Sequence, residues 1–243
     1  MLSDLEKKLK SLYDSFCGEM DINTTTGIVG DSSIRFSGAP YVGSRYENAK
    51  SRILFIGMDI GADEQFHDFG SRRNEISHTD RGFTEIPAKS PFNPHIYGTY
   101  AMSLALLNNI YGWDSIWNQF SSDLNRTACE AIKAFHKIIP VELLDYVSLT
   151  NTHKFVTIDR QNRTGDMDRY WQKEELEIDL LKKEVEIFDP EVIVIQSLGL
   201  SYLRDTLTIP SERVIVSAHP AARSRHYRSI GYITSLVNEF LNR

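Results

Sequence analysis

Residues 52–57 read Arg-Ile-Leu-Phe-Ile-Gly, a continuous apolar run that ends at a glycine. A run without alternating polarity is typical of a strand buried on both faces, as in a parallel sheet. Three more segments are predicted as strands, at residues 145–151, 191–196 and 213–218. The sequence therefore predicts a sheet of four parallel strands.

Helical periodicity fills the segments around these strands. Apolar residues recur at spacings of three and four within residues 2–16, 97–111, 127–139, 167–188 and 227–242, and a short helix is predicted near 200–205. Strands alternating with helices imply right-handed crossovers and a sheet covered on both faces. We expect an α/β fold of three α/β/α layers, in one domain over residues 1–243, in which residues 1–50 form an N-terminal helix and an extended approach segment.

The composition limits the class of protein. Hydrophobic residues make up 41% of the chain and charged residues 25%, which suits a globular protein. No apolar run approaches the ~18 residues of a membrane span, so no membrane segment is expected. The low cysteine content favours a reducing cytoplasm, and we expect a monomer. Two cysteines, Cys17 and Cys129, are too few for a disulfide framework or an iron–sulfur cluster.

Polar residues follow the predicted strands at one edge of the sheet, where open α/β sheets bind ligands. Asp59 follows the first strand, Asn151 ends the second and His219 follows the fourth. A carboxylate can activate water, an amide can read the edge of a pyrimidine, and a neutral imidazole can donate to a developing anion. Each residue also has a simpler interpretation: a helix cap for Asp59, a turn for Asn151 and a solvated loop for His219.

Three short motifs resemble those of the uracil-DNA glycosylase superfamily: Gly57-Met-Asp59-Ile-Gly61, Ser148-Leu-Thr-Asn151-Thr152, and the stretch from Ala218-His219 to Arg223. Within this superfamily, the three motifs most resemble those of the single-strand-selective monofunctional branch. They occur in the expected order across residues 50–243, and the stretch at 189–195 followed by Gly199 is also typical of the superfamily.

The resemblance implies a role for each matching position. Asp59 positions the attacking water, Asn151 reads the base and His219 stabilises the departing uracil anion. The base pocket is also expected to include Gly57, Met58, Gly61 and an aromatic ring beneath the base, with Phe92 as first choice and Tyr97 as second. Phe92 can equally be a core anchor. No cofactor, metal or iron–sulfur cluster is implied.

The sequence departs from the strict uracil enzymes at several positions. Ile60 and Gly61 replace a Pro-Tyr pair that excludes thymine, so a wider pocket is expected. Ala221 and Ala222 replace Ser-Pro and remove a hydroxyl that contacts phosphate. Residues 65–94 form a longer insertion than expected, and its histidines and aspartates match no known metal-ligand spacing.

The net charge of −6 is unusual for a nucleic-acid-binding protein, but positive charge is concentrated near the predicted site. Arg223 lies where relatives insert a wedge into the base stack. Arg225 and Arg228 follow it, and Lys154 follows the second strand. These four residues are the predicted contacts to DNA, whether single- or double-stranded.

The leading hypothesis is a monofunctional DNA glycosylase that hydrolyses the N-glycosidic bond of uracil or a related damaged base with an activated water. A non-catalytic nucleic-acid- or nucleotide-binding member of the same superfamily is the alternative. A third interpretation is a hydrolase acting on a nucleoside or nucleotide, with a metal held by Asp59, Asp63 and Glu64.

Overall fold

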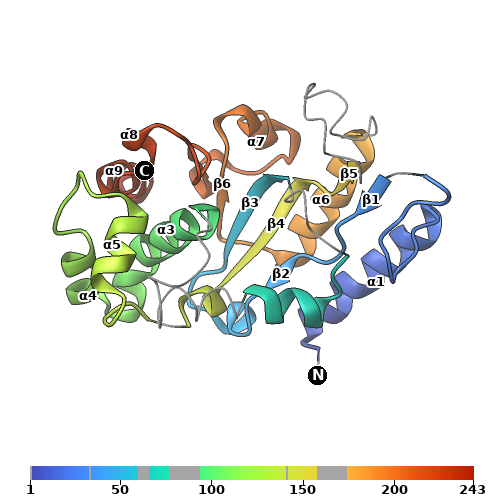
Figure 1. Ribbon diagram of the computed structural model, residues 1–243, viewed down its shortest axis with the longest axis horizontal. Coiled ribbons are helices and arrows are strands. Elements are labelled where there is room, and N and C mark those ends of the chain that lie inside the picture. Colours follow the sequence, from blue (N-terminus) through green and yellow to red (C-terminus); the bar gives the residue numbers. More distant parts are fainter. Residues whose placement is uncertain (1, 33, 60–65, 77–93, 141, 158–173) are drawn as a thin grey trace.

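The computed structural model describes residues 2–32, 34–59, 66–76, 94–140, 142–157 and 174–243 (Figure 1). Its centre is a five-stranded sheet in the order β2-β4-β3-β6-β7. The strands are β2 (Tyr41–Val42), β3 (Ile53–Asp59), β4 (Val147–His153), β6 (Val192–Ile195) and β7 (Val214–Val216).

Four of these strands, β4, β3, β6 and β7, are mutually parallel and coincide with the four predicted segments. The prediction of a four-stranded, wholly parallel sheet is wrong by one strand. The short β2 pairs antiparallel with β4, with Tyr41 opposite Leu149 and Val42 opposite Ser148. Two residues are too few to show a period of two, so this strand left no pattern in the sequence.

A second sheet, of two antiparallel strands, joins the approach segment to the chain beyond β4. It pairs β1 (Ile34–Phe36) with β5 (Phe155–Thr157). Phe36 and Phe155 are fully buried in it, with ring centroids 5.1 Å apart. The approach segment is therefore tied to the main fold twice, through β1 and through β2.

Helices cover both faces of the main sheet (Figure 1). One side carries α3 (Pro94–Tyr111), α4 (Asp114–Phe120), α5 (Ala128–Phe135) and α9 (Ile230–Leu241); the other carries α1 (Asp4–Glu19) and α6 (Glu174–Phe188). Two short helices, α7 (Leu203–Thr206) and α8 (Arg225–Arg228), lie at the edge where the parallel strands end (Figure 1). Residues 69–76 are also helical.

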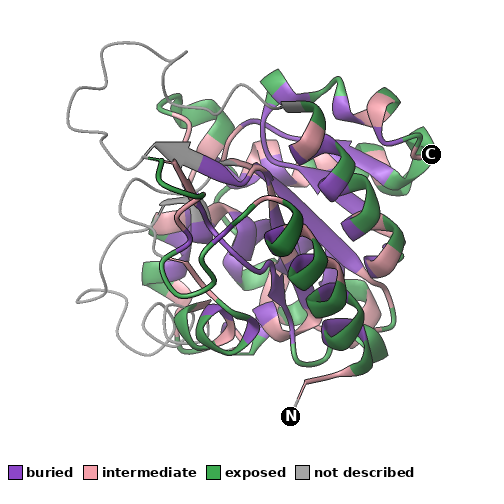
Figure 2. Cartoon of the chain, turned by 90° about the vertical axis from the view of Figure 1, so that its right-hand side faces the viewer, coloured by how far each residue is buried: buried purple, intermediate pink, exposed green. Residues whose placement is uncertain are grey.

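Alternate residues of each strand enter different cores, which is why the strands are apolar throughout. Ile53 and Phe55 belong to the core beneath α3, whereas Leu54 and Ile56 belong to the core beneath α1 and α6. Figure 2 shows the buried strands between helices whose outer surfaces are exposed. Burying each such side chain stabilises the fold by about 1.5–3 kcal/mol. The two-sided burial supports the layered α/β architecture.

Among the described helices, none combines the length and the apolar character needed to cross a membrane.

Candidate functional site

A row of polar or small residues crosses the sheet where the parallel strands end. In β3 and β4, Gly57 is paired with Asn151. The row continues through Gln196, whose N–H donates to Ile56 O at 2.9 Å, and Ser217, whose N–H donates to Ile195 O at 2.9 Å. Two positions earlier the same strands carry Leu149, Phe55, Val194 and Ile215, which belong to or pack against the α3-side core. The sheet thus changes from apolar to polar within two residues, at the edge that the sequence predicted.

Asn151 lies in the wall of a cavity of about 140 Å³. It is half-buried, and its neighbour Gly57 has no side chain to fill the space beside it. Polar side chains from four segments reach this cavity, which is lined by Ser37, Gly38, Ala39, Pro40, Tyr41, Arg72, Glu75, Ile76, Ile96, Leu149, Thr150, Asn151, Lys154 and Gln196. An amide in a partly enclosed polar cavity is suited to bind a ligand with both donors and acceptors.

Gln196 is a residue of this site that the sequence analysis did not select. It is buried, and its Nε2 donates to Thr99 Oγ1 of α3 at 2.7 Å. It lines both the Asn151 cavity and a second cavity described below. Its position as the polar residue that ends an apolar run was the available signal, the same signal that identified Asn151.

His219 lies in a tight turn that follows β7. The N–H of Ala221 donates to His219 Nδ1 at 3.1 Å, and the N–H of Ala222 donates to His219 O at 2.8 Å. Because Nδ1 accepts a hydrogen bond, the proton of the neutral ring is on Nε2. The turn therefore prepares the imidazole as a neutral donor through Nε2.

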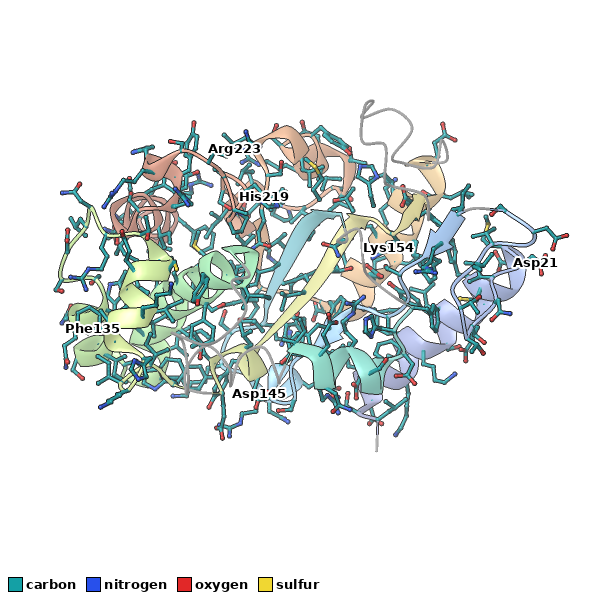
Figure 3. All side chains as sticks on the ribbon, in the orientation of Figure 1. Asp21, Phe135, Asp145, Lys154, His219 and Arg223 are labelled. Atoms are coloured by element: carbon teal, nitrogen blue, oxygen red, sulfur yellow. The ribbon has the colours of Figure 1, made fainter. Side chains whose placement is uncertain are left out.

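Two contacts hold this turn against the helices. The N–H of Ala218 donates to Tyr232 Oη of α9 at 2.8 Å. Pro220 packs against Gly98 of α3, where an added Cβ would lie only 3.0 Å from Pro220 Cα. Figure 3 shows His219 and Arg223 at the strand-end side of the sheet, with Asp145 at the opposite side.

Asp59 is the last residue of β3, and its backbone pairs with His153 in the β3–β4 ladder. Its side chain lies outside the described part of the structure, as do Gly61 and Phe92. Met58 is half-buried and packs on the core beneath α1 and α6, and it is not among the residues that line the Asn151 cavity.

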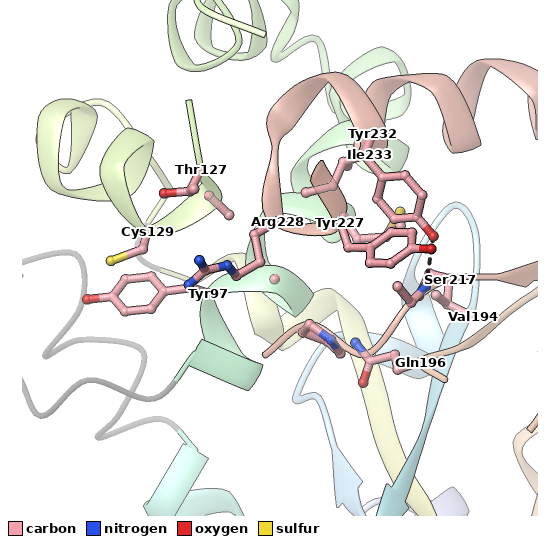
Figure 4. A pocket seen from close by; sticks show the side chains of 15 residues that line it. Tyr97, Thr127, Cys129, Val194, Gln196, Ser217, Tyr227, Arg228, Tyr232 and Ile233 are labelled. Carbon is pink, nitrogen blue, oxygen red and sulfur yellow. Dashed lines mark hydrogen bonds between the residues drawn. The ribbon is translucent and has the colours of Figure 1, made fainter. Parts of the chain in front are cut away.

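Tyr97 lines a different cavity from Asn151. This second cavity, of about 40 Å³, lies beneath α8 and α9 (Figure 4). Tyr97 is buried there beside Cys129, and burial raises the pKa of Tyr97 to about 12. The expectation that Tyr97 lies beneath a base held by Asn151 is not met, whereas the adjacent Ile96 does reach the Asn151 cavity.

The predicted DNA contacts separate into three groups. Arg223 and Arg225 are exposed, and Arg225 forms a loose ion pair with Glu130 at 3.7 Å. Arg228 is half-buried and extends into the second cavity beside Tyr97 (Figure 4). Lys154 is a correction: only 2% of it is exposed, and its Nζ binds Thr150 Oγ1 at 2.7 Å and Glu184 at 2.9 Å. A surface contact with DNA is therefore wrong for Lys154.

Within the described residues, no group of three or more histidine, cysteine or acidic side chains could hold a metal ion. Two members of the 65–94 segment have local roles. Asp68 caps the helix at residues 69–76 by accepting from Ser71 N at 2.7 Å, which lowers the pKa of Asp68. His67 Nε2 lies 3.5 Å from Glu75.

Comparisons with protein-family models, with curated proteins and with solved structures each find no match. Kinship with the uracil-DNA glycosylases therefore stays a prediction from the three motifs.

Proposed function

We propose that this protein is a monofunctional DNA glycosylase with a uracil-DNA glycosylase-like fold, and that it removes uracil or a related damaged base. The observation that carries the proposal is the state of His219. Its Nδ1 is occupied by the N–H of Ala221, so its Nε2 donates while the ring is neutral. A neutral donor at the strand-end edge, on the same sheet as the Asn151 cavity, is suited to stabilise a departing base anion.

In the proposed reaction, the base leaves the DNA stack and enters the Asn151 cavity. The amide of Asn151 pairs with the edge of the base by one donated and one accepted hydrogen bond. Asp59 orients a water molecule for attack on the sugar. The water oxygen bonds to C1′ as the C1′–N bond breaks, the bonding electron pair leaves with the base, and the water proton passes to the carboxylate. His219 donates from Nε2 to the base oxygen on which negative charge develops.

Contact with DNA is assigned to Arg223 and Arg225, the exposed cations beside His219. Arg223 comes four residues after His219, within reach of the strand from which the base is removed. Phosphate contacts from these two arginines give modest affinity that weakens with salt, which is compatible with a chain of net charge −6.

The test is a base-excision assay. Labelled single- and double-stranded DNA with one uracil is incubated with the purified protein, and abasic sites are then cleaved with alkali. We expect cleavage that persists in EDTA and disappears in Asp59→Ala. In His219→Ala the excision rate should fall about 100-fold or more, because removing one hydrogen-bond donor to a developing anion typically lowers the rate by that factor. Lys183→Met, an exposed change on α6, is the matched control and should retain full activity.

The other outcomes separate the alternatives. DNA binding without any excision would refute the proposed activity and support a non-catalytic binding protein. Activity that is lost in EDTA would instead support a metal-dependent hydrolase.

A further inference from the structure

A buried ionic cluster lies behind the Asn151 cavity. Its members come from three elements: Tyr13 from α1, Thr150 and Lys154 from the β4 region, and Glu184 from α6. Glu184 is fully buried and Lys154 is 2% exposed. The carboxylate of Glu184 accepts from Tyr13 Oη, from Thr150 Oγ1 at 2.8 Å and from Lys154 Nζ at 2.9 Å.

The carboxylate and the ammonium of this cluster differ in how many of their hydrogen-bonding positions are used. Glu184 accepts three hydrogen bonds, distributed over both of its oxygens. Lys154 has three N–H donors, and within the described residues two of them are used, toward Thr150 and Glu184. Lys154 also lines the Asn151 cavity, and Glu184 is not among the residues that line it. Of the pair, the lysine is therefore the member that contributes to the wall of the cavity.

Removing a charged pair from water costs several kcal/mol per ion, and apolar residues of similar volume often replace such a pair without loss of stability. Stability alone therefore does not account for a lysine at this position. A donor-only cation in the wall of the Asn151 cavity favours a ligand that presents an oxygen at that point and disfavours one that presents an amino group there.

On the basis of the proposed function, we propose that Lys154 binds a carbonyl oxygen of the extruded base through its third N–H and stabilises the negative charge that the base acquires as the C1′–N bond breaks. The substrate class is then oxo-bases such as uracil, and bases that present an amino group at this point are rejected. The base leaves with the electron pair of the broken bond and takes its proton from solvent afterwards.

The test compares two leaving groups, uracil and 5-fluorouracil, in the same DNA. Fluorine withdraws electrons and makes the departing anion more stable, so excision of 5-fluorouracil depends less on stabilisation of that anion by the protein. Lys154→Met removes the cation but leaves Glu184 buried without its counter-ion. The triple variant Tyr13→Phe/Lys154→Met/Glu184→Leu removes both charges and the Tyr13 hydroxyl and leaves only the Thr150 hydroxyl of the cluster. It is expected to fold, because apolar groups replace the ion pair. Lys183→Met is the control for loss of a lysine.

We expect the triple variant to keep a cooperative thermal transition, to lose about 100-fold in uracil excision, and to lose clearly less in 5-fluorouracil excision. Lys154→Met should show the same difference between the two bases. Equal losses on the two bases, or unchanged excision of both, would overturn the role of Lys154 while leaving the glycosylase proposal intact. Absence of excision by the unmodified protein would reject the proposed function and the role of Lys154 with it.

Discussion

Replacing Gly98 with alanine tests how the turn that contains His219 is positioned. Gly98 lies in the first turns of α3, and the added methyl group would meet Pro220, the residue bonded to His219. The new Cβ would lie 3.0 Å from Pro220 Cα and nearer still to Pro220 Cβ. Carbon atoms prefer separations of about 3.5–4.0 Å, so relieving the nearer contact requires the turn to move by about 1–1.5 Å.

Two effects on stability oppose each other in this variant. Alanine is favoured over glycine inside a helix by about 1 kcal/mol, and overpacking of this kind costs about 1–3 kcal/mol. The free energy of unfolding should therefore fall by only about 0–2 kcal/mol, a small change. Activity should fall much further, about 100-fold, because a displacement of about 1 Å at a reacting group has that effect.

The measurements are urea unfolding and the rate of uracil excision from single-stranded DNA under single-turnover conditions. Gly18→Ala is the matched control, because Gly18 is also helical and its added Cβ would meet nothing within 4 Å. That control should be stabilised by up to about 1 kcal/mol with no change in rate. A Gly98→Ala protein with normal excision would refute the view that contact with α3 positions His219.

Three further predictions concern separate parts of the molecule. Thr127→Ala should lower the free energy of unfolding by about 1 kcal/mol, because Thr127 and Glu130 form a capping box at the start of α5; an unchanged urea midpoint would contradict this. The pKa of Tyr97 is raised from 10.0 to about 12, so its contribution to stability is complete below pH 10 and is lost as the pH rises toward 12. Tyr97→Phe should therefore show a shallower alkaline loss of stability, and an unaltered pH dependence would be evidence against the burial effect. Arg223→Ala should reduce the slope of log affinity for DNA against log salt by about 1, whereas the distant, exposed Lys8→Ala should not; equal slopes for both variants would remove Arg223 from the interface.

The candidate site was predictable to the extent that it depends on the order of strands. Asn151 and Gly57 lie in one row because parallel strands end at a common edge, and each was identified from its place at the end of an apolar run. Gln196 satisfies the same criterion and was missed only because no motif drew attention to it. The tautomer of His219 was beyond prediction, because it depends on the path of the backbone at Ala221.

The predicted DNA contacts required exposed side chains, and two of the four predicted residues are not exposed. Lys154 and Arg228 were grouped with Arg223 and Arg225 because all four are cationic and close to the motifs in sequence. Lys154 is buried by a carboxylate 30 residues away, on α6, and Arg228 extends under its own short helix into the second cavity. Charge and proximity in sequence do not specify which side of a turn a long side chain will occupy.

The sequence by itself determined the alternation of four parallel strands with helices and the edge at which polar residues gather. These features are encoded in local periodicity, which each segment carries without reference to its partners. Only the tertiary structure decided the antiparallel strand β2, the burial of Lys154 and the separation of Tyr97 from Asn151. Each of these depends on contacts between residues far apart along the chain, such as Tyr13 with Glu184, 171 positions apart, and Tyr41 with Leu144, 103 positions apart. Such pairings are selected by the packing of the whole core, because a buried polar group is stable only where its partner is supplied.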